Sequence, residues 1–253
     1  MQNATQKTKQ KTHFFTYTNN ELDSLKAKDT RLAGVVEKIG RIKREVDSDL
    51  IASVVHHIIA QQISTKAQES IWARFCDRFG AKDNVRQKAG QNLHNNSSKN
   101  SRQKARNLAP QSKLNIESLI SAGVDNLRSC GVSARKAEYI IDFARKVQAR
   151  EFDIERVKKM SDKEAIDELV KLRGIGVWTA EMILLFCLQR KDILSYDDLA
   201  LQRALKLLYG INGEGKQGKI PKNVFETYRA KFSPYDSIAS LYLWEIASTQ
   251  FEV

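Results

Sequence analysis

The sequence predicts an all-α fold. Apolar residues recur at helical spacing over most of the chain, and no convincing alternation typical of a β-strand occurs. Of the 253 residues, 42% are hydrophobic and 28% are charged, close to the average of globular proteins, and only 3 are prolines. This composition excludes fibrous and wholly disordered classes, and the chain is long enough for one large or two small domains.

Residues 50–79 predict two helices with a polar joint between them. The apolar positions keep helical spacing on both sides of the joint at residues 61–64; they are Leu50, Val54, Ile58, Ala67, Ile71 and Phe75. Ser64 and Thr65 suit a helix cap, so the second helix is expected to begin at about Lys66.

Caps and periodicity predict further helices along the chain. Residues 115–129 have helical spacing, and Ser133 caps a helix that runs through Lys146. Residues 161–164 read Ser-Asp-Lys-Glu, which fits a capping box before a helix at 165–172. The connections between these helices are therefore expected to be short.

The formal net charge of +12 is concentrated in two polar stretches. Residues 81–115 carry +7 and residues 1–12 carry +3, so the rest of the chain is nearly balanced. We expect a disordered basic tail at 1–12 and an irregular basic insert at about 87–112. Such stretches are either solvated loops or auxiliary contacts to phosphates, and the charge alone does not decide between the two.

Cysteine spacing and hydropathy exclude several classes of protein. Cys76, Cys130 and Cys187 lie far apart, which indicates neither a disulfide framework nor a zinc or iron–sulfur site. The apolar runs are too short to span a bilayer, and the start, rich in Gln and Lys, lacks the apolar core of a secretion signal. We therefore expect a soluble, intracellular protein without membrane contact.

Residues 169–186 predict a helical hairpin with a short turn. One helix stops at Gly174, a left-handed cap, and the next begins near Val177. Gly174 and Gly176 let the backbone approach a ligand closely, and the free amides at the start of the second helix face an anion such as a DNA phosphate. Taken alone, the pattern also fits a plain tight turn.

Two acidic residues, Asp197 and Asp198, follow the hairpin where one helix ends and another starts. The residues Leu-x-Gly-Ile-Gly-x-Trp-Thr-Ala at 172–180, followed by Asp-Asp-Leu-Ala-Leu-x-Arg at 197–203, resemble the helix-hairpin-helix (HhH-GPD) DNA glycosylase superfamily, and within it the DNA-3-methyladenine glycosylase II branch. The likeness extends to three further segments, which are residues 58–67, 130–140 and 235–244. It covers about residues 14–250 but excludes the basic tail and the insert.

The resemblance implies a base-excision enzyme made of two helical bundles with the active site between them. Residues 50–192 would form the bundle with the hairpin, and residues 13–49 with 193–253 the bundle that carries the catalytic aspartate. The partner would be double-stranded DNA with a damaged base, which is flipped out because the glycosidic bond is unreachable inside the stack.

The family's essential aspartate falls on Asp198, because this acid directly precedes the Leu-x-Leu-x-Arg pattern. A carboxylate stabilises the positive charge that builds on the sugar as the C1′–N bond breaks, and it orients water. Asp197 is the rival for this role, or a helix N-cap with a purely structural role.

Trp178 indicates the type of glycosylase. Bifunctional relatives carry a lysine at this place, whose amine attacks the sugar and allows strand nicking. Lys171, on the preceding helix, suits a phosphate contact or plain surface instead. The resemblance therefore implies a monofunctional enzyme without AP lyase activity. No cofactor and no metal site are expected, apart from a monovalent cation at the hairpin backbone.

The resemblance also implies a pocket for the base, formed by Trp178, Trp244, Tyr196 and Met182. An N-alkylated purine is cationic, so an indole face attracts it by stacking and by a cation–π interaction of roughly 0.5 to 2 kcal/mol. Trp72 has no match in this pattern and is expected in the core. His56 and His57, on an apolar helix, are expected to pack rather than to act as acid or base.

Three segments are implied to contact DNA, and their residues are Gln61 and Gln62; Val132, Ser133, Arg135 and Lys136; and Gly174, Gly176 and Thr179. Gln61 and Gln62 lie where the family fills the gap left by the flipped base, with a structural cap as the alternative. The loop at 131–136 fits a second wedge and a phosphate contact at a helix N-terminus.

The function expected from the resemblance is removal of alkylated purines, of the 3-methyladenine type, by a monomeric enzyme that acts on DNA in the cytoplasm, or in the nucleus of a eukaryote. A glycosylase for another lesion, such as uracil or a deaminated purine, remains an alternative. A catalytically silent helix-hairpin-helix module is a further one, although such a module needs no acid at Asp198.

Overall fold

The computed structural model describes residues 13–47, 49–80, 113–214 and 218–248. Within these residues the chain is helical, and the β-type pairing consists of isolated bridges such as the one between Phe14 and Glu45. The helices are α1 (Asn19–Lys28), α2 (Thr30–Ile39), α3 (Leu50–Ala60), α4 (Thr65–Phe79), α6 (Ile116–Arg128), α7 (Ala134–Gln148), α8 (Ile154–Lys159), α9 (Asp162–Leu169), α10 (Val177–Phe186), α11 (Leu199–Tyr209), α12 (Lys222–Phe232) and α13 (Asp236–Ser248). The all-α prediction is confirmed for this part of the chain.

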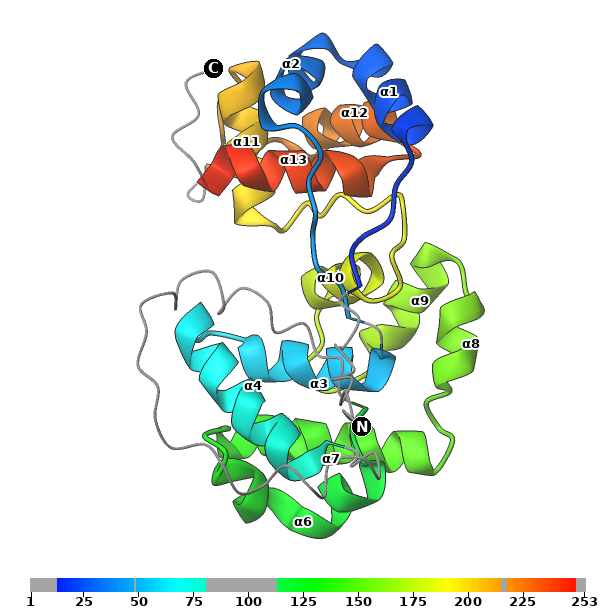
Figure 1. The fold of residues 1–253 in the computed structure, drawn as a ribbon, viewed down its shortest axis with the longest axis vertical. Coiled ribbons are helices and arrows are strands. Elements are labelled where there is room, and N and C mark those ends of the chain that lie inside the picture. The colour runs from blue at the N-terminus through cyan, green and yellow to red at the C-terminus, as the bar shows by residue number, and fades with distance from the viewer. Residues whose placement is uncertain (1–12, 48, 81–112, 215–217, 249–253) are drawn as a thin grey trace, which may run out of the picture.

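The helices form two groups, one above the other in Figure 1. The lower group contains α3, α4 and α6 to α10, and the upper group contains α1, α2 and α11 to α13. The chain passes between the groups at residues 40–49 and again at 187–198. The second connection ends in Asp198, the residue before α11.

Helices of the lower group begin at side-chain caps. Those at Ser64 and Ser133 are predicted from the sequence, whereas Asn115 is the N-cap of α6 and not the first residue of the predicted helix at 115–129. The side chains of Ser64, Asn115 and Ser133 accept hydrogen bonds from backbone amides at the starts of α4, α6 and α7. Ser161 and Glu164 form a complete capping box at α9. This helix ends at Leu169 rather than at 172, because the chain already turns toward the hairpin there.

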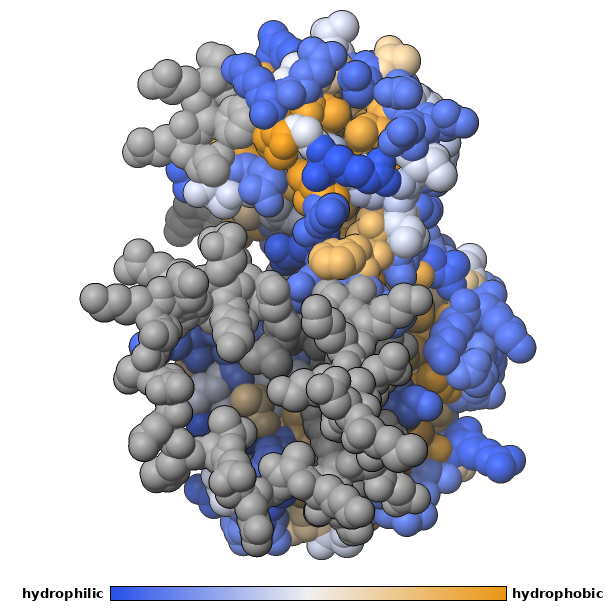
Figure 2. Space-filling view, in the orientation of Figure 1, coloured by the Kyte–Doolittle hydropathy of each residue, from blue (hydrophilic) through white to orange (hydrophobic). Residues whose placement is uncertain are grey.

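The core runs through both groups and contains the residues predicted for it. Trp72 is 2% exposed and stacks on Phe75, with 6.0 Å between the ring centroids, so its core assignment is confirmed. On the face drawn in Figure 2, hydrophilic residues cover most of the described surface, and hydrophobic residues show mainly between them.

Two of the excluded classes can be checked in the structure. All three cysteines are free thiols. Among the described residues, no helix is both long and apolar enough to cross a membrane. The predicted basic tail at 1–12 and the insert at 87–112 lie outside the described residues.

Candidate active site

The hairpin turn depends on Gly174. Its φ of +86° lies in the left-handed region, and a Cβ added there would be 2.4 Å from Cδ2 of Tyr139 on α7. The side-chain amide of Gln61, at the end of α3, donates to the Gly174 carbonyl at 2.6 Å. Gly176, the N-cap of α10, has no atom within 4 Å of the place of a Cβ. Gly174 therefore packs the hairpin, and Gly176 is the glycine that leaves room for a ligand.

We expect Gly174→Ala to lower the free energy of unfolding by about 2 to 4 kcal/mol, because alanine would be strained at this φ and would clash with Tyr139. Gly176→Ala is the matched control and should cost at most about 1 kcal/mol, the scale of a changed N-cap. Urea unfolding followed by circular dichroism measures both. Equal losses in the two variants would show that Gly174 has no special packing role.

Asp198 is the N-cap of α11 and is 7% exposed. Its Oδ1 accepts hydrogen bonds from the amides of Ala200 and Leu201 at 2.8 and 2.9 Å. Its Oδ2 accepts from Nε1 of Trp178 at 3.1 Å. Three donors from two helices thus fix the orientation of this carboxylate, and they bring together Asp198 and Trp178, two of the predicted site residues.

The capping role that was an alternative for Asp197 belongs to Asp198 instead. Asp197 points to the surface, where Oδ1 is 2.9 Å from Nζ of Lys219 and the side chain is 54% exposed. The interpretation of Asp197 as the N-cap is therefore wrong. The physical reason is the helix register, since the amides free at the start of α11 face the side chain of the residue directly before Leu199.

Trp178 lies in the first turn of α10 and is 42% exposed. The N–H edge of its indole is held by Asp198, while part of the ring remains accessible. The chain neighbours of this pair, Val177 and Leu199, are 50% and 68% exposed. Exposed large apolar side chains next to a nearly buried carboxylate are typical of a binding surface rather than of a core.

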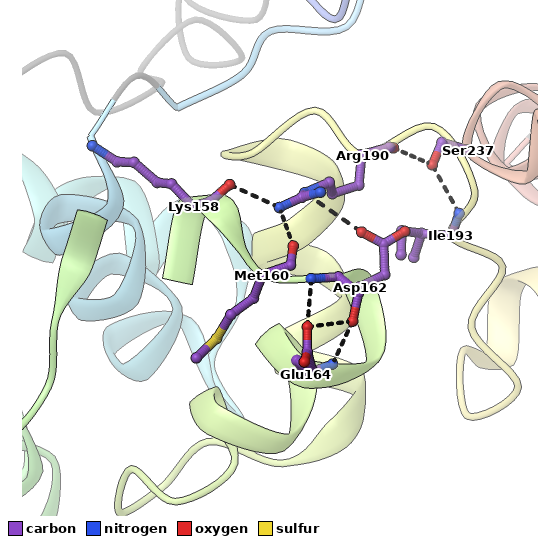
Figure 3. A network of polar contacts seen from close by, with 8 residues as sticks. Lys158, Met160, Asp162, Glu164, Arg190, Ile193 and Ser237 are labelled. Carbon is purple, nitrogen blue, oxygen red and sulfur yellow. Dashed lines mark hydrogen bonds and ion pairs between the residues drawn. The ribbon is translucent and has the colours of Figure 1, made fainter. Parts of the chain in front are cut away.

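The connection that leads to Asp198 is anchored on both sides (Figure 3). Arg190 donates to the carbonyls of Lys158 and Met160, at the end of α8, at 2.9 and 2.8 Å. The carbonyl of Arg190 accepts from Oγ of Ser237 on α13 at 2.6 Å, and this Oγ accepts from the amide of Ile193 at 3.0 Å. Residues 190 and 193 of this connection are thereby bonded to one helix of each group, α8 and α13.

Glu181 is a residue near this site that the sequence analysis missed. It is 9% exposed, and it accepts a hydrogen bond from Oγ of Ser195, within the same connection. Burial raises the pKa of Glu181; the carboxylates of Asp197 and Asp198 add to the rise, while Ser195 and Arg229 oppose it. The signal that could have revealed it is a lone acid within the apolar run of α10.

Glu181 also lines a cavity of about 230 Å³ that includes neither Asp198 nor Trp178. The lining residues are Asp162, Lys163, Ile166, Asp167, Glu181, Asp192, Ile193, Leu194 and Arg229. Acidic side chains outnumber basic ones in this lining, which disfavours a polyanion there. We therefore place the candidate site at the Trp178–Asp198 pair and not in this cavity.

The other three residues predicted for the pocket have different surroundings. Met182 follows Trp178 by one turn of α10 and is buried, yet it lies outside the contiguous hydrophobic core. The ring of Trp244 stacks on Phe186 at the far end of α10, with 5.3 Å between centroids. The hydroxyl of Tyr196 donates to the carbonyl of Ile220 at 3.0 Å. Of the three, Met182 is the one placed beside Trp178.

The two glutamines at the polar joint differ in their contacts. Gln61 is half-buried. Its side-chain amide donates to the Gly174 carbonyl, and its backbone carbonyl accepts a hydrogen bond from Nζ of Lys136 at 2.6 Å. Gln62 is exposed, and its φ of +55° is in the left-handed region. Gln61 is therefore tied to the hairpin, whereas Gln62 faces solvent at the sharp turn between α3 and α4.

The loop before α7 and the start of α10 contain the remaining residues predicted to contact DNA. Ser133 and Arg135 are exposed at the start of α7, where free amides are available. Val132 and Thr179 are both 5% exposed. Nζ of Lys136 donates to the carbonyls of Ile59 and Gln61, so its charge caps the C-terminus of α3. Of these residues, Ser133 and Arg135 are open to a ligand.

Comparison with protein families assigns the chain. A model described as "HhH-GPD superfamily base excision DNA repair protein" matches residues 55–234, a range that includes the hairpin and the Trp178–Asp198 pair. The chain belongs to the HhH-GPD superfamily. The family resemblance found in the sequence is thereby confirmed.

Curated relatives of this HhH-GPD chain carry glycosylase names. The putative DNA-3-methyladenine glycosylase YfjP of Bacillus subtilis is 34% identical over 128 residues, which is 51% of this chain and 43% of YfjP. The DNA-3-methyladenine glycosylase of Saccharomyces cerevisiae is 27% identical over 256 residues, which is 91% of this chain and 74% of the yeast protein. The match thus spans less than half the length of YfjP.

Solved structures of similar fold extend over nearly the whole HhH-GPD chain. The DNA-3-methyladenine glycosidase of Bacillus halodurans superposes with a TM-score of 0.69 at 30% identity, covering 94% of both chains. The 3-methyladenine DNA glycosylase Mag1 of Schizosaccharomyces pombe, in complex with abasic DNA, gives a TM-score of 0.65 at 22% identity and covers 92% of this chain and 98% of Mag1. The second likeness shows a shared fold.

Proposed function

We propose that this chain is a monofunctional DNA glycosylase that hydrolyses the N-glycosidic bond of alkylated purines, of the 3-methyladenine type, and leaves an abasic site. The observation that carries the proposal is the Trp178–Asp198 pair, a fixed carboxylate beside an accessible indole. The names of the relatives from Bacillus and Saccharomyces support the same activity. The partner is duplex DNA, and the enzyme acts as a monomer where DNA is found, in the cytoplasm or the nucleus.

Asp198 is the group that lowers the barrier in this mechanism. Breaking the C1′–N bond builds positive charge on the sugar, and a preorganised carboxylate stabilises that charge without having to reorient. The two amides on Oδ1 and the indole N–H on Oδ2 hold the side chain in place before the substrate arrives. Oδ1 already accepts two hydrogen bonds and Oδ2 accepts one, so the remaining lone pair of Oδ2 is available to orient the attacking water.

Trp178 supplies the attraction for the base. The flipped nucleotide reaches Asp198 past the exposed ring, and an alkylated purine is a cation when it stacks on an indole face. Its leaving group is already activated, so no general acid is required. Met182, one turn further along α10, would then contact the inner edge of the base.

This chemistry needs no cofactor, since the reaction consumes water alone. A monovalent cation at the hairpin backbone stays a prediction. Two carbonyls of the turn already accept hydrogen bonds, that of Leu172 from the amide of Ile175 and that of Gly174 from Gln61.

The test of the proposed function is release of free base. The full chain is incubated with duplex DNA treated with a methylating agent, and released bases are separated by chromatography. We expect 3-methyladenine among the products. Release from uracil-containing or deaminated DNA instead would favour the alternative lesion. Tight binding with no release from any of these duplexes would favour a silent DNA-binding module.

Product DNA should remain uncut until heat or alkali is applied, because residue 178 is tryptophan and offers no amine. Lys171, before the hairpin turn, and Lys219, bonded to the residue before Asp198, are both engaged: Nζ of Lys171 is 2.6 Å from Glu168, and Nζ of Lys219 is 2.9 Å from Asp197. Borohydride trapping measures this directly. A covalent protein–DNA adduct in good yield would disprove the monofunctional mechanism, and Lys219→Gln would then identify or exclude that lysine.

Gln62→Ala should slow base release by about tenfold. The free energy that corresponds to this factor is a part of the few kcal/mol that unstacking a base costs. The reason is that Gln62 is exposed at the joint and its amide is free to fill the gap left by the flipped base. Single-turnover kinetics on duplex DNA measures the effect. Gln61→Ala is the contrasting variant, because loss of its bond to Gly174 should lower the melting temperature. A slow Gln61 variant beside a normal Gln62 variant would reverse the assignment.

A further inference from the structure

Three metal-ligating side chains meet where the connection from α2 reaches α3. Asp47 lies on the connection, and His56 and His57 lie on α3. One ligand atom from each, a carboxylate oxygen and two imidazole nitrogens, all lie within 4.8 Å of one another. The amide of Asp47 donates to the carbonyl of Phe186, the last residue of α10, at 2.7 Å. The cluster is therefore at the opposite end of α10 from Trp178.

The carboxylate in this cluster is buried. Asp47 is 6% exposed, and burial raises its pKa to about 7 although Ser53 donates a hydrogen bond to it. The charged neighbour that acts on it is a second carboxylate, that of Asp49, which raises the pKa further. A buried carboxylate is stable either with a proton or beside a positive charge, and a metal ion would provide the latter.

Hydrogen bonds orient both imidazoles of this cluster. Nδ1 of His57 is 2.8 Å from the carbonyl oxygen of Ser53, to which it donates its proton, leaving the lone pair of Nε2 free. Nε2 of His56 is 2.8 Å from the side-chain nitrogen of Gln68, which donates to it. Binding of a metal by Nδ1 of His56 therefore requires the Gln68 amide to turn by 180°, so that its oxygen accepts from Nε2–H and the lone pair of Nδ1 is free. The contact between His57 and Ser53 is of the kind that fixes the tautomer and ring orientation of metal-bound histidines.

We propose that Asp47, His56 and His57 form a binding site for a divalent transition-metal ion. Two imidazole nitrogens and one carboxylate oxygen match the ligand preference of Zn²⁺, with water completing the coordination. A bound ion ties the connection at residues 40–49 to α3 and so stiffens one of the crossings between the two groups of helices. Its role is structural, because the cluster contacts the C-terminal end of α10, whereas Asp198 is bonded to Trp178 at the N-terminal end of that helix.

The test uses the full chain without an affinity tag, freed of metal by a chelator. Calorimetric titration with Zn²⁺ should give one ion per chain, and Co²⁺ should give the visible absorption of a site with nitrogen and oxygen ligands. Zn²⁺ should also raise the melting temperature. Asp47→Asn and His57→Gln should each weaken binding by at least about tenfold. Absence of one-to-one binding by the parent chain would overturn the proposal.

Two control variants should bind Zn²⁺ like the parent. His13→Gln removes an exposed histidine outside the cluster. Cys187→Ser removes a thiol that lies within reach of Ser53 and Asp47 but is not one of the three donors. Loss of binding in Cys187→Ser, or unchanged binding in both cluster variants, would show that the donor set is wrong.

A measurement on the parent chain keeps the test independent of variant folding. Nitrogen NMR should show that Zn²⁺ shifts Nε2 of His57 and leaves the imidazole of His13 unchanged. Shifts confined to His13 would overturn the site. Neither this result nor the titration depends on glycosylase activity, so the metal site and the proposed function can fail separately.

Discussion

Asp198→Asn should slow base release by at least about a hundredfold, the loss expected when one preorganised electrostatic group is removed from an active site. The fold should persist, because the asparagine oxygen can accept the same hydrogen bonds from Ala200 and Leu201, and asparagine is as good an N-cap as aspartate. DNA binding should persist or become tighter. Single-turnover release from methylated duplex DNA and fluorescence anisotropy measure the two properties.

Asp197→Asn is the matched control for this experiment. It removes the same charge one residue away but disrupts only the surface ion pair with Lys219, worth about 1 kcal/mol or less. Base release by this variant should stay within a few-fold of the parent chain. If Asp197→Asn stops turnover and Asp198→Asn does not, the catalytic assignment is wrong.

Asp236→Asn should stabilise the chain at alkaline pH. Asp236, in the first turn of α13, is fully buried, and neither carboxylate oxygen has a hydrogen-bond partner among the described residues. Burial raises its pKa from 3.8 to about 8; Asp192 and Glu226 add to the rise, while Arg229 and Lys28 oppose it. The folded state therefore holds a proton that the unfolded chain releases in this range.

The sign of the pH dependence follows from this raised pKa. Below about pH 4 the Asp236 carboxyl is protonated in both the folded and the unfolded chain, so its ionisation does not affect the free energy of unfolding. As the pH rises to about 8, the unfolded chain loses this proton first, and the free energy of unfolding falls by on the order of 5 kcal/mol in total. Asparagine carries no such penalty, so the free-energy difference between variant and parent should increase over this range. Urea unfolding at several pH values measures it. Asp47 and Glu181 titrate equally in both proteins, so a difference that is constant with pH would refute the assignment.

Local features of the fold could be predicted from the sequence, because a helix cap involves residues three or four positions apart. Ser64, Ser133 and the box from Ser161 to Glu164 were found in this way. Helix α9 ends at Leu169, before the predicted end at 172, because residues 170–173 already turn toward the hairpin. The close packing of Gly174 against Tyr139 on another helix likewise does not follow from spacing along the sequence.

The sequence predicts the two residues at the centre of the candidate site but not their contacts. The family pattern pointed to Asp198 and Trp178, but not to the hydrogen bond that joins them. The pattern likewise could not show that Lys136 binds the end of α3 or that Tyr196 binds Ile220, because both partners are distant in the sequence. Glu181 was overlooked, although an acid within an apolar run is a visible signal of a buried polar contact.

In the proposed mechanism Asp198 is both a helix cap and the reactive carboxylate, and this double use has an evolutionary consequence. The codons of aspartate and asparagine differ at their first base alone, and asparagine is expected to preserve the start of α11. Under the proposed function, a point mutation would therefore give a stable chain that still binds DNA but cuts no glycosidic bond. In a population of such genes, inactive but well-folded descendants should arise more readily here than from an active site whose acid has no part in the fold.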